Sequence, residues 1–133
     1  MARILVIDDQ KDVRSVISIV LRVNRFEVVE AANAAEGLRA FEEGHFDAAI
    51  VDVFLDDAIG FDVIAKMRAS VPDLPVIAVS GMVSLDMAPQ VDDLPNVACL
   101  KKPFRPSELI AAITAAQEAA RPSRNADQRL AAG

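Results

Sequence analysis

Phe46-Asp47-Ala48-Ala49-Ile50-Val51-Asp52 is a short stretch whose apolar run stops at a carboxylate, and a turn containing Gly60 follows it. A short apolar run bounded by turn signals is typical of a fully buried strand. In open parallel sheets, ligands bind just beyond the carboxyl ends of the strands. Asp52 therefore lies where a functional residue is expected, although an Asp in this position is also a common turn residue or helix cap. Whether Asp52 is a functional residue or only a turn residue depends on which residues end the other strands.

Size and composition indicate one domain with an aliphatic core. The chain has 133 residues, 53% of them hydrophobic, with six Phe and no Tyr or Trp, which fits a single domain.

A formal net charge of −6 argues against binding of free nucleic acid or an anionic membrane surface. The one cysteine, Cys99, excludes an internal disulfide and favours a reducing cytoplasm. We expect no signal peptide, because Asp8 and Asp9 come too early, and no membrane insertion, because the uncharged stretch 74–85 is too short.

Apolar runs and helical patterns alternate along the chain. Four further runs resemble buried strands, at residues 3–7, 26–31, 75–79 and 97–100, and the one at 26–31 carries two Glu, as expected at a sheet edge. Between the first two runs, apolar residues recur at the spacing of one helix face: Val13, Val16, Ile17, Val20 and Leu21. This alternation predicts an α/β fold with a parallel sheet wrapped by helices.

Capping and turn residues indicate where the helices begin and end. Asn33, with Glu36 three residues later, resembles a capping box, and Gly44 is a natural stop for that helix. Gly60 permits the turn into a helix at residues 61–69, and Pro106 suits the first turn of the last helix.

Two segments depart from the regular pattern. The fourth helix should lie within residues 84–95, but Pro89 removes a backbone donor there, so we expect a short or irregular helix. Residues 121–133 show no apolar period, and we expect them to form a flexible tail after a domain at residues 1–120.

Polar residues follow four of the predicted strands: Asp8 and Asp9, then Asp52, Ser80 and Lys102. Clustered carboxylates repel one another unless a cation lies among them, and their hard oxygens suit Mg²⁺. A hydroxyl and an ammonium facing them would receive the oxygens of an anion, which is an arrangement for phosphoryl transfer to a carboxylate. Each residue also has a structural explanation: the Asp pair as a helix cap, Ser80 as a turn residue and Lys102 as a solvated loop lysine.

From about residue 3 to residue 120, the chain resembles the receiver domains of two-component response regulators. The resemblance implies a doubly wound, flavodoxin-like α/β fold with a five-stranded parallel sheet in the order 2-1-3-4-5, which brings the polar residues to one edge. It rests on Ile-Asp-Asp at residues 7–9, Asp52 with Leu55 and Gly60, Val-Ser-Gly at residues 79–81 and Lys-Pro-Phe at residues 102–104.

The resemblance implies a role for each of the polar residues. Asp52 is the residue that accepts the phosphoryl group. Ser80 donates a hydrogen bond to a phosphoryl oxygen in the active state, and Lys102 pairs with the phosphoryl group. The bond between Lys102 and Pro103 is commonly cis in the family.

The same resemblance implies a Mg²⁺ site. Its direct ligands would be Asp9, Asp52 and the backbone carbonyl of Phe54, and Asp8 would act largely through water. The cofactor expected for this chain is therefore Mg²⁺.

The chain also departs from the family pattern. Asp56 stands where the family often has Pro, and Asp57 is expected to add charge close to the site. Cys99 occupies the position of the Tyr or Phe that usually swings on activation, which puts the usual switch in doubt.

These features predict a stand-alone bacterial receiver that takes a phosphoryl group from a histidine kinase or a phosphotransfer protein. It would catalyse its own phosphoryl transfer and dephosphorylation, signal by protein contact or serve as a relay or phosphate sink, and be a monomer or weak dimer. One alternative is a pseudo-receiver, an interaction module that is never phosphorylated. Another is a small Mg²⁺-dependent phosphatase, but that class would have a second acid two residues after its nucleophile, where this chain has Phe54.

Overall fold

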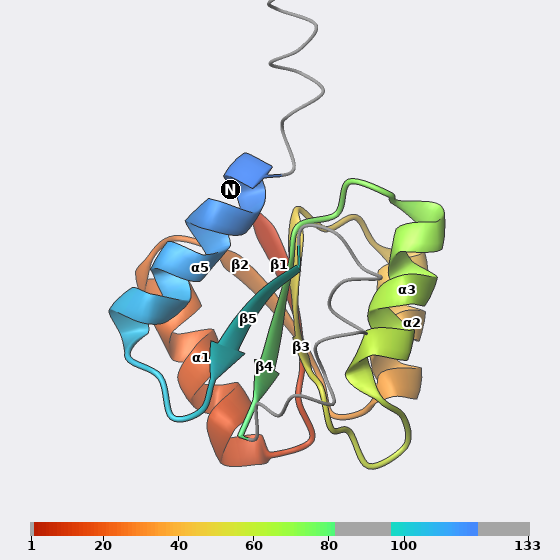
Figure 1. Ribbon diagram of the computed structural model, residues 1–133, viewed down its shortest axis with the longest axis horizontal. Helices are drawn as coiled ribbons and strands as arrows, with labels where there is room; N and C mark the ends of the chain where they lie inside the picture. The colour runs from red at the N-terminus through yellow and green to blue at the C-terminus, as the bar shows by residue number, and fades with distance from the viewer. Residues whose placement is uncertain (1, 82–96, 120–133) are drawn as a thin grey trace, which may run out of the picture.

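Five parallel strands form one sheet in the order β2-β1-β3-β4-β5 (Figure 1). They are β1 (Arg3–Ile7), β2 (Glu27–Ala31), β3 (Ala48–Asp52), β4 (Val76–Ser80) and β5 (Val97–Lys101). This computed structural model describes residues 2–81 and 97–119. The predicted strand order is confirmed, and β2, with its two Glu, lies at an edge as expected.

Helices cover both faces of the sheet: α1 (Lys11–Val23) and α5 (Pro106–Ala119) lie on one side, and α2 (Ala34–Glu43) and α3 (Gly60–Ser70) lie on the other (Figure 1). The predicted fourth helix, with Pro89, and the predicted tail at residues 121–133 lie outside the described residues. Within the described part of the chain, no helix combines the length and the apolar character needed to cross a membrane.

The core is divided in two by the sheet. Leu5 and Ile7 of β1 pack in the cluster that includes residues of α2 and α3, whereas Ile4 and Val6 pack in the cluster that includes residues of α1 and α5. β3 and β4 alternate in the same way, because successive side chains of a strand point to opposite faces. A parallel sheet covered on both faces is buried on both, which explains why its strands are continuous apolar runs.

The predicted inner face of α1 is partly wrong. Ile17 and Leu21 are fully buried, as expected, but Val16 is 55% exposed. Each residue turns the helix by about 100°, so Val16 and Ser18 lie on opposite flanks of Ile17. The helix is rotated toward the Ser18 side, and Ser18 is buried in place of Val16.

The amino end of α2 has the predicted cap with one difference. The Asn33 side chain accepts a hydrogen bond from the Glu36 N–H at 2.8 Å, which confirms Asn33 as the capping residue. The Glu36 carboxylate reaches back to the N–H of Ala32 at 2.9 Å, one residue before the position that a capping box would give. The helix ends at Glu43, immediately before Gly44, as predicted.

Gly60 lies against the end of β3 too closely for any side chain. Its N–H donates to the carbonyl of Val53 at 2.6 Å. A Cβ on Gly60 would overlap the carbonyl oxygen of Asp52 and would lie 2.8 Å from the Cα of Val53. The connection from β3 to α3 therefore folds back on the strand that carries Asp52.

We predict that Gly60→Ala lowers the free energy of unfolding by about 1–3 kcal/mol, because backbone atoms must move to admit the methyl group. Gly81→Ala is the matched control, since no atom of the described residues lies within 4 Å of the Cβ that it adds. Urea denaturation followed by circular dichroism measures both variants. Equal stabilities of the two variants would contradict the prediction.

Candidate functional site

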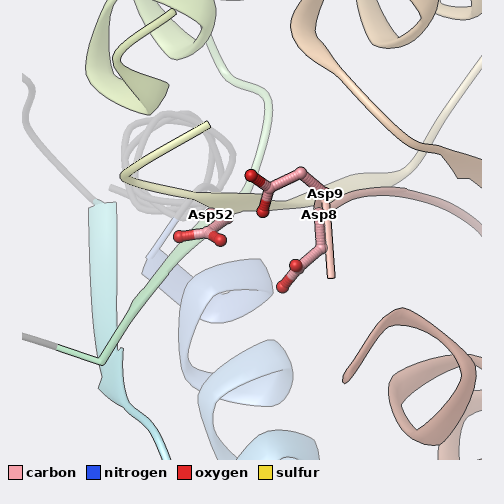
Figure 2. Close-up of side chains that lie close together, drawn as sticks. All are labelled: Asp8, Asp9 and Asp52. Carbon is pink, nitrogen blue, oxygen red and sulfur yellow. The ribbon is translucent and has the colours of Figure 1, made fainter. Parts of the chain in front are cut away.

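The strand register brings the predicted site residues to one edge of the sheet. Ile7 pairs with Val51, so the residues that follow them, Asp8 and Asp52, are neighbours across β1 and β3. Asp8, Asp9 and Asp52 each contribute a carboxylate oxygen, and these oxygens lie within 4.8 Å of one another (Figure 2). The predicted convergence of the three acids is therefore present in the structure.

The acids are held in an environment that disfavours their charge. Asp8 is 1% exposed and Asp52 is 5% exposed, whereas Asp9 is partly exposed. Two like unit charges about 4 Å apart repel by about 4 kcal/mol at an effective dielectric constant of about 20. Such a cluster requires a compensating cation.

Lys102 supplies a positive charge inside this cluster. Its Nζ lies 3.0 Å from Asp8 Oδ2 and 3.2 Å from Asp52 Oδ2, and it donates to Gln10 Oε1 at 3.1 Å. The Lys102–Pro103 peptide bond is cis, as the resemblance implied. The interpretation of Lys102 as a solvated loop lysine is wrong, because the side chain is only 14% exposed and contacts two carboxylates.

Asp8 belongs to the site and also fixes the start of α1. Its Oδ1 accepts a hydrogen bond from the N–H of Gln10 at 2.8 Å, and its backbone carbonyl accepts from Arg14 Nη1 at 2.7 Å. Its Oδ2 is buried and ion-paired with Lys102 but accepts no hydrogen bond from the described residues. The N-cap residue of α1 is Gln10 rather than either Asp, so the helix-cap interpretation of the Asp pair is wrong, and Asp8 instead binds the N–H of that N-cap residue.

Asp52 is bound on both carboxylate oxygens. Oδ1 accepts the N–H of Phe54 at 3.1 Å, and Oδ2 faces Lys102. Burial raises the pKa of Asp52 above its ordinary value, and the nearby Asp8 raises it further, while the Phe54 N–H and the Lys102 ammonium act in the opposite direction. The environment without a metal ion therefore disfavours the ionised form of the Asp52 carboxylate.

Ser80 and Phe54 complete the predicted set. Ser80 is 2% exposed at the end of β4, the strand that pairs with β3. The Phe54 side chain is 52% exposed, while its backbone N–H contacts Asp52. Both residues therefore lie at the same sheet edge as the acids.

The two acids that follow Leu55 behave differently from each other. Asp56 hydrogen-bonds Asp9, and the adjacent Asp9 raises the pKa of Asp56. Asp57 was expected to add charge close to the site, but its carboxylate instead accepts the N–H groups of Ala34 and Ala35, which lower its pKa. The sequence offers no local signal for this contact, because the partners are 22 and 23 residues apart.

Gln10 and Arg14 are site residues that the sequence did not indicate. Gln10 follows the acid pair directly, but its partner Lys102 is 92 residues away. Arg14 lies on α1 and donates to the Asp8 carbonyl. Cys99, in the position of the usual aromatic residue, is exposed on β5 by its surface area, although partial burial of its thiol raises the pKa of Cys99.

Comparison with known proteins is consistent with this geometry. The sequence profile of the response regulator receiver domain matches residues 4–114. The chain belongs to the response regulator receiver domain family.

Several relatives of known name are similar to this receiver domain. The transcriptional regulatory protein PrrA of Mycobacterium tuberculosis is 35% identical over 118 residues, which cover 85% of this chain and 48% of PrrA. The DNA-binding transcriptional regulator NtrC of Rhizobium meliloti is 32% identical over 128 residues, which cover 95% of this chain and 26% of NtrC. The chain therefore spans about half or less of the length of these relatives.

Solved structures show the same fold over nearly their whole length. A CheY-like receiver domain protein from Methanospirillum hungatei superposes with a TM-score of 0.86 at 28% identity, covering 92% of this chain and 98% of that chain. A receiver domain protein from Clostridium thermocellum gives a TM-score of 0.81 at 30% identity, covering 89% of this chain and 95% of that chain.

We predict that Asp52→Asn raises the melting temperature of the metal-free protein at pH 7 by a few degrees. A carboxyl whose pKa is raised by folding weakens the fold progressively as the pH rises above its unfolded pKa, and the loss is complete above its folded pKa. The gain from Asp52→Asn should therefore shrink as the pH falls and disappear below about pH 4, where both states are protonated.

Thermal unfolding in EDTA at several pH values measures this effect. Asp73→Asn, at an exposed turn, is the control for the same chemical change outside the cluster. An Asp52→Asn variant that is less stable than the wild type at pH 7 would show that the contact with Lys102 outweighs burial.

Proposed function

We propose that Asp52 accepts a phosphoryl group from a histidine kinase or phosphotransfer protein in a bacterial cytoplasm, and that the reaction requires Mg²⁺. The observation that carries this proposal is one acceptor carboxylate that lies with two further acids within 4.8 Å and with the Lys102 ammonium at 3.2 Å. Family membership supports the same function, because receiver domains are the phosphoryl-accepting partners in two-component signalling.

The residues present fit a Mg²⁺ ion. All the donors are oxygens, which Mg²⁺ prefers, and Asp8 Oδ2 is buried without a hydrogen bond from the described residues. Asp9, Asp52 and the Phe54 carbonyl would hold the ion directly, with Asp8 acting largely through water. Bound Mg²⁺ would neutralise the charge that gathers between the acids and the phosphoryl oxygens.

The loop geometry supports the Phe54 carbonyl as a ligand. Phe54 pairs with Ile59 in an isolated antiparallel bridge, and the hydrogen bonds of this bridge belong to the flanking residues. In such a pair, the N–H and C=O of each residue point away from its partner. The Phe54 N–H reaches Asp52 Oδ1 at 3.1 Å, and its carbonyl therefore points toward the acid cluster as well.

The chain's own groups would act in sequence during transfer. An oxygen of Asp52 forms the new bond to phosphorus, and the bond from phosphorus to the donor nitrogen breaks with its electron pair leaving on the donor. Lys102 then pairs with the phosphoryl oxygens, and the Ser80 hydroxyl donates to one of them. These contacts stabilise charge in the product. Because the acceptor is the chain's own Asp52, the chain modifies itself and does not turn over a separate acceptor substrate as an enzyme would.

Exposed apolar side chains on α1, the helix that borders the site, support a protein donor. Val16 and Ile19 of α1 are 55% and 60% exposed. A groove of about 530 Å³ lies between α1 and the segment that follows β5, and Lys102 and Phe104 line it. A donor docked on this side would bring its phosphoryl group to Asp52, and the expected monomer or weak dimer would leave the face accessible.

Two outputs are consistent with phosphorylation at Asp52. The first is stand-alone signalling by protein contact, as a messenger, relay or phosphate sink. The second is control of transcription within a longer protein, which the names of PrrA and NtrC favour. A pseudo-receiver without phosphorylation is the rival class, and the complete set of acceptor, acids, hydroxyl and lysine argues against it.

We predict that acetyl phosphate with Mg²⁺ adds one phosphoryl mass to the wild-type protein, as measured by intact mass spectrometry. The mass should be absent in Asp52→Asn and when EDTA replaces Mg²⁺. An unmodified wild-type protein, or modification that persists in Asp52→Asn, would exclude Asp52 as the acceptor.

Lys102→Met should separate metal binding from phosphoryl transfer. The wild-type ammonium contacts Asp8 and Asp52, so its removal should strengthen Mg²⁺ binding, measured by calorimetry. Phosphorylation at saturating Mg²⁺ should slow on the order of 10²-fold, because a donor to the phosphoryl group is lost. Lys66→Met, an exposed lysine of α3, should change neither quantity. Weaker Mg²⁺ binding in Lys102→Met would contradict the expected competition.

A further inference from the structure

The loop between β3 and α3 is attached to a helix on the other side of the site. Asp57 Oδ1 accepts the N–H of Ala34 at 2.9 Å, and Asp57 Oδ2 accepts the N–H of Ala35 at 3.1 Å. Ala34 and Ala35 are the first two residues of α2. One carboxylate of the loop thus accepts hydrogen bonds from two N–H groups at the amino end of a helix.

This contact gives hydrogen-bond partners to N–H groups of α2 that the capping residue Asn33 does not bind. The first N–H groups of a helix have no partner within the helix, and Asn33 satisfies only that of Glu36. The positive end of the helix dipole also favours an anion at this place. The contact is therefore favourable for the loop and for the helix alike.

The loop itself is a tight hairpin. Gly60 N–H donates to the Val53 carbonyl at 2.6 Å, and Leu55 N–H donates to the Ala58 carbonyl at 3.1 Å. Asp57 lies in the turn between Leu55 and Ala58, at the tip of this hairpin. The hairpin is consequently fixed at its base by β3 and at its tip by α2.

The helix that receives the tip is also packed against β1. Gly37 of α2 lies so close to Ile7 that an added Cβ would be 2.7 Å from Ile7 Cγ1. Ile7 directly precedes Asp8 and Asp9 in the chain. A single helix thus contacts both the strand that delivers the acid pair and the loop that carries Phe54.

We propose that Asp57 is a positioning residue of the metal site: by tying the hairpin tip to α2, it holds the Phe54 carbonyl in place beside the acids. The inference rests on the proposed function, in which that carbonyl binds Mg²⁺. Asp57 does not touch the ion and acts through the loop. Loss of its carboxylate frees the tip, so part of the Mg²⁺ binding energy must be spent on ordering the loop.

The alternative is a purely structural role, in which Asp57 only stabilises α2. Asn33→Ala separates the two roles, because Asn33 caps the same turn of α2 without contacting the hairpin. Loss of an N-cap side chain costs about 1 kcal/mol, so this variant should lose stability while its loop stays attached.

The primary test is calorimetric titration of MgCl₂ into the full chain without phosphoryl donor. For Asp57→Ala, we expect a Kd for Mg²⁺ about tenfold above that of the wild type, at the low end of the effect of losing a residue that orients metal ligands. Asp57→Asn retains one acceptor oxygen and should give an intermediate value. Asn33→Ala should bind Mg²⁺ like the wild type.

A kinetic test gives a second readout. With acetyl phosphate, Asp57→Ala should need about tenfold more Mg²⁺ for the half-maximal rate, while its rate at saturating Mg²⁺ stays close to that of the wild type. Amide hydrogen exchange should also become faster at Ala34 and Ala35 in this variant, which shows directly that the tie is lost.

The outcomes separate this inference from the proposed function. If the wild type binds Mg²⁺ and is phosphorylated but Asp57→Ala binds Mg²⁺ equally well, the positioning role is wrong and the proposed function stands. An equal weakening in Asn33→Ala would assign the effect to α2 stability and would also overturn the inference. A wild type that binds no Mg²⁺ would overturn both.

Discussion

Electrostatic repulsion among three carboxylates is the constraint on which the rest of this structure depends. Asp8, Asp9 and Asp52 are close because β1 and β3 are adjacent parallel strands, so the residues that follow their carboxyl ends lie at the same edge of the sheet. Lys102 offsets part of the repulsion by contacting two of the three acids. The pKa of Asp52 is still raised, mainly because burial disfavours the charged carboxylate and to a smaller extent because Asp8 is near. The fold thus holds the Asp52 carboxylate where a divalent cation would stabilise its charged form.

The position of each charged group follows from the order of the strands rather than from local sequence. β1 and β4 flank β3, and β5 lies beyond β4. An acid from one neighbour and a hydroxyl from the other therefore border the strand that ends in Asp52, while the lysine reaches in from the strand beyond. Burial of both sheet faces fixes the register, because a slip of one residue would exchange the two halves of the core. The same apolar packing that stabilises the domain also fixes the site geometry.

The sequence was sufficient for the architecture and for the principal site residues. Continuous apolar runs identified the strands, and a carboxylate, hydroxyl or lysine at the end of four of them identified the site. Sheet order and individual roles came from the family resemblance, since periodicity alone does not order strands. Val16 was misassigned because a helical pattern gives the width of an apolar face but not its final rotation against the sheet. Gln10 was not indicated, and the contact of Asp57 with α2 was not predicted, because their partners are distant in sequence and have no motif of their own.

The separation of Lys102 from the acids along the chain has a consequence for synthesis. Its partners Asp8 and Asp52 precede it by 94 and 50 residues, respectively, so both acids leave the ribosome well before the lysine does. A growing chain that has produced β3 carries the acidic half of the pocket with no ammonium to balance it. Contacts between such distant residues form late in folding, since loop closure must precede them. The pocket therefore acquires its charge balance only when the last strand joins the sheet.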